Sequence, residues 1–135
     1  MTLIAVFLDK ESNEVRALSD TRVTDPEGLT ITDFAPKLFS LAIKETVGKP
    51  EVGDTLRWEC GFAFAGYVMA ANSVYTSSAA ILSNIFRKPG SERLSLAEVS
   101  EVVRKVYEDI FYDVCFRRPS QSRFVLNSAV SIFGF

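Results

Sequence analysis

Histidine is absent from the 135-residue sequence. Without an imidazole, the chain cannot form a Ser-His or Cys-His relay, and it lacks the side chain on which most transition-metal sites draw. Any hydrolytic reaction of this chain must therefore take its base from another group. We expect neither a metal nor an organic cofactor.

Cysteine is scarce: the two residues are Cys60 and Cys115, and they do not form a CxxC pair. Each lies in a segment predicted to be regular structure, which favours reduced, buried thiols over a disulfide. We find no signal-peptide pattern at the start of the sequence. These features lead us to expect a cytoplasmic protein.

The chain also lacks a large net charge, since 15 basic and 17 acidic residues give a formal net charge of −2. The mixed signs predict no basic face for nucleic acid and no polybasic patch for an anionic membrane. Residues 60–86 carry no charge, and a run of this kind can span a bilayer. Because Gly66 and several Ser, Thr and Asn residues interrupt it, a buried strand followed by a helix is the favoured interpretation.

What the sequence does contain is apolar: 47% of residues are hydrophobic, and 11 are Phe. This composition predicts one folded domain over residues 1–135. Hydrophobic periodicity predicts an N-terminal hairpin of strands 3–8 and 15–18, a turn at 25–28, and further strands at 29–34, 36–43 and 56–65, with a surface loop at 44–56. Two helices are expected next, at 67–86 and 96–116. Strands at 123–126 and 129–135 end the predicted order. Ser95 and Glu98 form a capping box before the second helix. The expected fold class is α+β, a mostly antiparallel sheet covered by a helix pair.

Four short segments occur in an order that resembles proteasome β-type subunits and their bacterial threonine-peptidase relatives. They are residues 2–6 (TLIAV), 18–24 (LSDTRVT), 36–39 (PKLF) and 64–67 (FAGY), the last of which opens a predicted helix. These proteins are N-terminal nucleophile hydrolases. The resemblance implies that the chain forms the N-terminal part of a four-layer αββα sandwich, with its remaining layers outside residues 1–135. It also implies a completing chain or self-association.

The resemblance implies a role for six residues. An N-terminal threonine, here Thr2, would act as the nucleophile with its own α-amine as base, a pairing that needs no histidine. Lys37 would lower the proton affinity of that amine, and Asp20 would hold the lysine. The backbone at Gly66 and Tyr67 would donate to the oxyanion, and Thr21 would pair with a bound peptide.

Four of these residues also have a structural explanation, and for Thr21 it is the ordinary preference of threonine for strands. Asp20 can end a strand, Lys37 can snorkel at a sheet edge, and Gly66 can serve an ordinary strand-to-helix turn. In the register of the resemblance, Met1 occupies the nucleophile's place and Thr2 the next one. Three functions therefore stay open: a threonine peptidase, a catalytically inactive assembly or binding subunit, and a small-molecule amide hydrolase of the same fold.

Overall fold

The computed structural model describes residues 3–24, 29–32, 35–48, 54–117 and 128–134. The chain begins with a hairpin of β1 (Ile4–Asp9) and β2 (Glu14–Ser19), which pair antiparallel from Ile4 opposite Ser19 to Asp9 opposite Glu14. The turn between them places Asn13 at a positive φ of 54°, a conformation that Asn tolerates better than most residues. The predicted hairpin is confirmed. A short antiparallel ladder of β3 (Val23–Thr24) and β4 (Thr30–Thr32) follows it.

The centre of the molecule is a four-stranded sheet in the order β7-β5-β6-β8. Its long antiparallel pair is β5 (Leu38–Val47) with β6 (Asp54–Ala65). On one side β7 (Ile85–Arg87) runs parallel to β5, and on the other β8 (Ala129–Phe133) runs antiparallel to β6. The ring of Phe133 lies against Gly61, where a Cβ atom would come within 2.1 Å of it. A glycine at this position therefore lets β8 dock in register.

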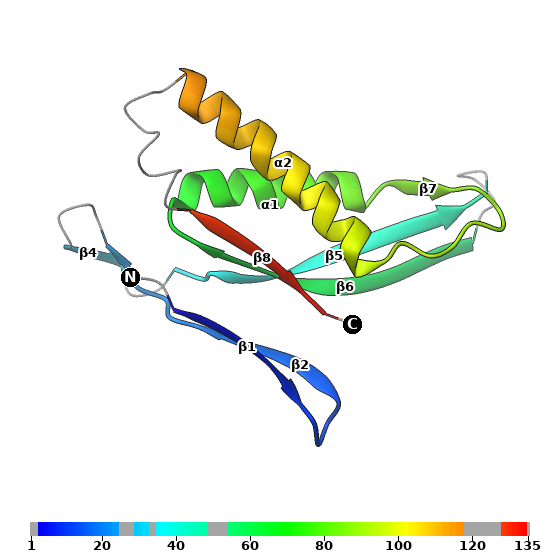
Figure 1. Cartoon of the computed structure of the whole chain (residues 1–135), viewed down its shortest axis with the longest axis horizontal. Coiled ribbons are helices and arrows are strands. Elements are labelled where there is room, and N and C mark those ends of the chain that lie inside the picture. The colour runs from blue at the N-terminus through cyan, green and yellow to red at the C-terminus, as the bar shows by residue number, and fades with distance from the viewer. Residues whose placement is uncertain (1–2, 25–28, 33–34, 49–53, 118–127, 135) are drawn as a thin grey trace.

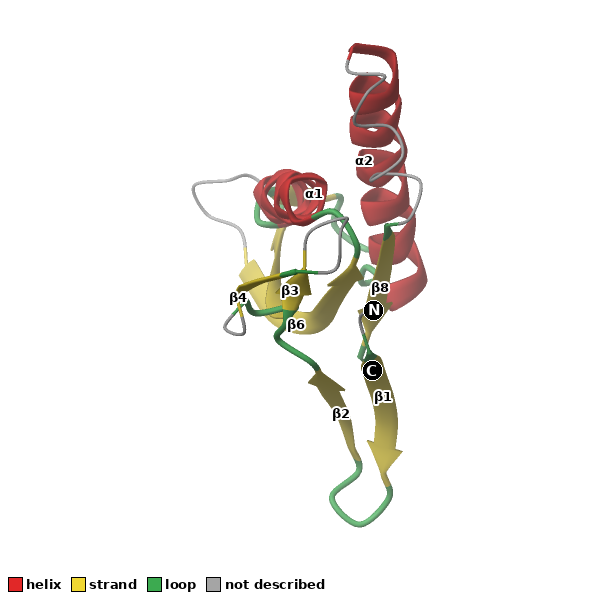
Figure 2. Ribbon diagram, turned by 90° about the vertical axis from the view of Figure 1, so that its left-hand side faces the viewer, coloured by secondary structure: helices red, strands yellow, loops and turns green. Residues whose placement is uncertain are grey.

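Two helices cover the same face of this sheet (Figures 1 and 2). They are α1 (Val68–Leu82) and α2 (Leu96–Arg117), and Figure 2 shows the β1–β2 hairpin on the opposite side of the sheet. The core lies between the helices and the sheet, because the side chains that alternate onto that face of β5 and β6 are mostly apolar, with Glu45 as a charged exception. Its fully buried members include Leu41, Ile43, Phe62, Phe64, Leu82 and Val99. The fold is α+β, as expected.

The capping box is confirmed at the start of α2. The Ser95 N–H donates to Glu98 Oε2 at 2.8 Å, and the Glu98 N–H donates to Ser95 Oγ at 3.2 Å. The helix ends at Arg117, one residue beyond the predicted end. No helix within the described ranges is long and apolar enough to cross a membrane.

Three predictions of local structure were wrong. Much of the predicted surface loop 44–56 is strand, because β5 continues to Val47 and β6 begins at Asp54. The first helix ends at Leu82, not at Phe86, and residues 85–87 instead form β7. The two helices are therefore not consecutive, although the sheet is mostly antiparallel, as expected, with β7 as its parallel strand. In each case pairing with β5 outweighs the local pattern, because a strand edge with unpaired backbone groups is a strong template.

Other predictions lie partly or wholly outside the described residues. The turn at 25–28 and the strand at 123–126 are in this group. The predicted strand 29–34 is described only at 29–32, where β4 forms. The strand after Pro36 begins two residues later, at Leu38, in keeping with the missing N–H of proline.

Candidate functional site

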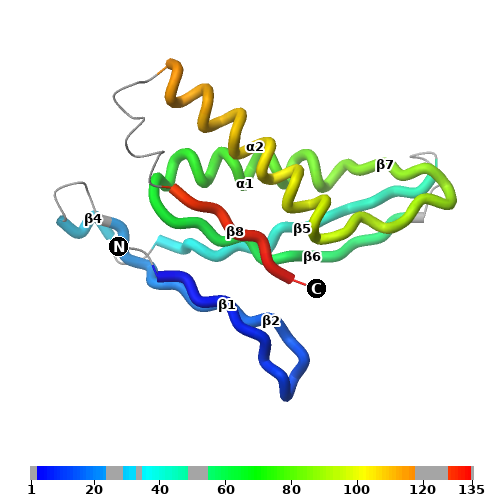
Figure 3. Tube along the Cα trace, viewed as in Figure 1, coloured from blue at the N-terminus to red at the C-terminus, as the bar shows by residue number. Residues whose placement is uncertain are grey.

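The segments that carry the candidate residues meet at one end of the four-stranded sheet. The start of β5, the end of β6 and the start of β8 lie together there (Figure 3). The Phe64 N–H donates to the Lys37 carbonyl at 3.1 Å, which sets Lys37 alongside the last residues of β6 before Gly66. The Ala35 N–H donates to the Thr21 carbonyl at 3.0 Å and brings in the segment after β2. Residues distant in sequence are therefore joined through the backbone.

Lys37 is the buried cation of this site, with 3% of its surface exposed. Its Nζ lies 3.0 Å from Asp20 Oδ2 and donates to the Arg22 carbonyl at 2.6 Å. A buried ammonium is costly unless it is paired and hydrogen-bonded, and these two acceptors meet that need. The side chain does not extend into solvent, so the alternative of a lysine snorkelling at a sheet edge is wrong.

Asp20 joins the lysine to the N-terminal strand. Its Oδ1 accepts a hydrogen bond from the Leu3 N–H at 2.9 Å, and its own N–H donates to the Leu3 carbonyl at 3.1 Å. Desolvation raises the pKa of this carboxyl. The hydrogen bonds from Lys37 and Leu3, together with the positive charges of Lys37 and the chain's α-amine, lower the pKa by more, so that it lies below its usual 3.8. Asp20 is therefore a fixed anion between the start of the chain and Lys37.

The structure gives little information on two of the predicted site residues, Thr2 and Thr21. Thr2 lies outside the described residues. Thr21 is exposed, and its carbonyl is already engaged by the Ala35 N–H. The role of Thr21 in pairing with a peptide remains a prediction.

The turn from β6 into α1 contains Gly66 and Tyr67. Gly66 has a φ of 101°, in the region where only glycine is unstrained. The Tyr67 N–H donates to Ser128 Oγ at 2.9 Å, while no hydrogen bond among the described residues uses the N–H of Gly66, which is an exposed residue. Of the two backbone groups predicted as oxyanion donors, the Gly66 N–H is the one available to a ligand.

Sequence reasoning missed Ser128 and Tyr107. Ser128 precedes β8, and its carbonyl accepts a hydrogen bond from the Tyr107 hydroxyl of α2 at 2.9 Å. A single serine before an apolar strand has no distinguishing pattern, and Tyr107 lies within the helical periodicity of α2. Neither residue could have been recognised without the tertiary contacts.

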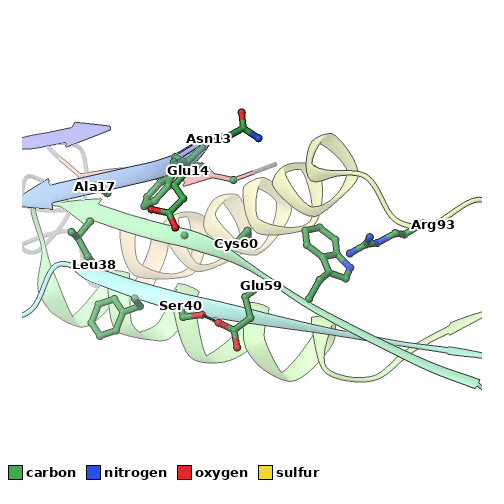
Figure 4. Close-up of a pocket in the computed structure, with 14 residues that line it drawn as sticks. Asn13, Glu14, Ala17, Leu38, Ser40, Glu59, Cys60 and Arg93 are labelled. Atoms are coloured by element: carbon green, nitrogen blue, oxygen red, sulfur yellow. Dashed lines mark hydrogen bonds between the residues drawn. The ribbon is translucent and has the colours of Figure 1, made fainter. Parts of the chain in front are cut away.

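A cleft of about 760 Å³ lies between the β1–β2 hairpin and the open face of the sheet (Figure 4). Leu38, the neighbour of Lys37, lines one end of it, and Arg93 lies at the other. Ser40 and Glu59 form its polar floor, with a hydrogen bond of 2.6 Å between Oγ and Oε2. The cleft therefore runs along β5 to its first residue, Leu38, which follows the buried lysine.

The described part of the chain offers no group of three or more Cys, Asp or Glu side chains placed to hold a metal ion. What the site does offer is a buried, fixed cation beside the N-terminal strand and a left-handed turn with an open N–H. Comparisons with protein-family models, curated proteins and solved structures returned no match. The local geometry is thus the basis for a functional proposal.

Proposed function

We propose that this protein is a threonine-type peptidase with an N-terminal nucleophile, similar to proteasome β-type subunits. The observation that carries the proposal is the chain of contacts from Lys37 through Asp20 to the backbone of Leu3, at 3.0 and 2.9 Å. The lysine is held out of solvent and joined through Asp20 to Leu3, the residue that follows Thr2. This is the place where a cation would tune the amine of an N-terminal threonine.

In the proposed reaction, removal of Met1 leaves the α-amine on Thr2. This amine takes the proton of the Thr2 hydroxyl as the oxygen attacks the peptide carbonyl, and the positive charge of Lys37 favours the neutral amine that can act as base. The Gly66 N–H stabilises the oxyanion. The departing amine of the substrate receives the proton, and water then hydrolyses the ester to regenerate Thr2.

The wider fold belongs to the same proposal. The helix-covered sheet would form two layers of an αββα sandwich, and the β1–β2 hairpin would belong to the second sheet. In support, the open sheet face and the hairpin enclose a cleft, and the hairpin exposes apolar side chains. A completing segment, a partner chain or a second copy would cover these side chains.

The exposed hairpin also supports a second candidate, an inactive subunit that acts in assembly. Leu18 is 64% exposed and Leu8 50%, with Phe7 at 45%. Apolar groups gathered in this way mark an interaction surface. In this candidate Met1 stays in place and the buried lysine has only a structural role.

One experiment separates the two candidates. The purified full chain is incubated with a threonine-directed peptide epoxyketone, and its intact mass is measured. For the peptidase we expect a single adduct on a species that lacks Met1. Thr2→Ala should give no adduct, whereas Thr76→Ala, which alters an exposed threonine of α1, should react like the wild type. An unmodified protein that retains Met1 would contradict the peptidase and favour the assembly subunit.

A further inference from the structure

Ser128 connects three elements through two hydrogen bonds. Its Oγ accepts the Tyr67 N–H at 2.9 Å, and its carbonyl accepts the Tyr107 hydroxyl at 2.9 Å. The first bond reaches the turn before α1, and the second reaches the middle of α2. One residue at the start of β8 therefore ties the Gly66–Tyr67 turn to the second helix.

The bond to Tyr67 fixes one peptide plane of that turn. Tyr67 is the N-cap residue of α1, and its side chain makes no capping hydrogen bond. Its N–H belongs to the peptide group that follows Gly66, where φ is 101° and a glycine backbone has wide freedom. The Ser128 hydroxyl, which lies just before β8, restrains this peptide plane from outside the turn.

We propose that Ser128 is a positioning residue that orients the Gly66–Tyr67 turn so that the Gly66 N–H, not the Tyr67 N–H, receives the oxyanion. This inference rests on the proposed peptidase function. By engaging the Tyr67 N–H, Ser128 leaves the Gly66 N–H as the other donor at the turn and restrains the peptide plane on the far side of Gly66, while the pairing of Ala65 with Ala129 restrains the near side. A donor held in place stabilises developing charge without reorganising during the reaction.

Tyr107 holds Ser128 from the side of α2. A crevice of about 280 Å³ separates α2 from β8 at this point, and the hydroxyl of Tyr107 bridges it. The Tyr107 ring stacks near Phe111 at a centroid distance of 6.1 Å, which restrains its orientation. Desolvation by burial raises the pKa of Tyr107 above its ordinary value, so the hydroxyl keeps its proton and donates at neutral pH.

A purely structural role would look different in kinetics. The first N–H groups of a helix lack intrahelical partners, and a serine that satisfies one of them stabilises the helix. Loss of that contact alone would lower the free energy of unfolding and leave the turnover of the folded enzyme unchanged. Loss of a positioning contact would lower kcat in protein that is still folded.

The test compares Ser128→Ala with Ser128→Thr, which keeps a hydroxyl, and with Ser131→Ala, an exposed serine on the adjoining strand β8. Cleavage of a fluorogenic peptide is measured well below the unfolding transition of each variant. We expect Ser128→Ala to lose about tenfold or more in kcat with KM within about twofold, since small misplacements of reacting groups cost rate. Ser128→Thr should recover most of the loss, and Ser131→Ala should match the wild type.

Amide hydrogen exchange provides a readout that needs no activity. Ser128→Ala should accelerate exchange at the Tyr67 amide, and Ser131→Ala should not. If the wild type cleaves the peptide and Ser128→Ala keeps its kcat, the positioning role is wrong while the peptidase stands. If the wild type neither cleaves the peptide nor reacts with the epoxyketone, the peptidase is wrong and the positioning role fails with it. Unchanged Tyr67 exchange in Ser128→Ala would overturn the contact itself.

Discussion

The chemistry of the site depends on the few atoms around Lys37. Its side chain is 3% exposed, and its ammonium contacts the Asp20 carboxylate and the Arg22 carbonyl. Asp20 is less buried, with 30% of its side chain exposed, so solvent weakens its share of the ion pair. The pair is therefore best tested through its dependence on pH and not through its total contribution to stability.

The pKa of Asp20 lies below its usual value in the folded protein because Lys37 and Leu3 favour the charged form. The stability that this provides is present above about pH 4 and is lost as the pH falls through the lowered pKa. We predict that Asp20→Asn lowers the free energy of unfolding by about 1–3 kcal/mol at pH 7 and reduces its decline between about pH 5 and 2. Urea unfolding at a series of pH values measures both effects.

Glu11→Gln serves as the control for that experiment, because Glu11 is an exposed carboxylate in the hairpin turn. Its unfolding free energy should decline with acid as in the wild type. If Asp20→Asn also follows the wild type across the acid range, Lys37 is not held by this carboxylate in solution.

Among the elements, the β5–β6 pair depends on one buried charge. Glu45 is fully buried, and it receives the indole N–H of Trp58 at 2.8 Å and the Leu94 N–H at 3.1 Å. Arg87 Nε lies 2.7 Å from its Oε2, an ion pair that is not aligned as a hydrogen bond. These contacts join β5, β6, β7 and the segment before α2.

Glu45→Gln should destabilise the protein by about 3 kcal/mol, because it leaves the Arg87 guanidinium without its anion in a buried site. Glu59→Gln is the matched control on the neighbouring strand: that side chain is exposed, and its amide can still accept from Ser40. We expect a change of less than about 1 kcal/mol there. Equal effects of the two substitutions in urea unfolding would show that Glu45 does not hold the elements together.

At the scale of the whole molecule, apolar burial is concentrated between the helices and the four-stranded sheet. Leu41 is fully buried in this core, whereas Leu18 on the hairpin is 64% exposed. We predict that Leu41→Ala lowers the free energy of unfolding by about 2–5 kcal/mol and Leu18→Ala by less than about 1 kcal/mol. Urea unfolding of the two variants measures the difference.

A large loss in Leu18→Ala that grows with protein concentration would mean that the hairpin is buried in an assembly. A large loss that does not depend on concentration would contradict this division of the molecule into core and hairpin. The same pair of variants thus distinguishes a free hairpin from one covered by a second copy.

Local interactions made several features predictable from sequence alone. The β1–β2 hairpin, the Ser95–Glu98 capping box and the extent of α2 all depend on residues within a few positions of one another. The absence of histidine and the order of Asp20, Lys37 and Gly66 along the chain can likewise be read from the sequence. That these residues form a peptidase site remains a proposal.

Only the tertiary structure decided the features that depend on contacts between distant residues. The burial of Lys37, the continuation of β5 through Glu45, the parallel strand β7 and the bonds of Ser128 to Tyr67 and Tyr107 have no local signal. The physical reason is the same in each case. A polar group or a strand edge takes whichever partner the assembled fold places beside it, and the hydrophobic pattern of a single segment does not contain that information.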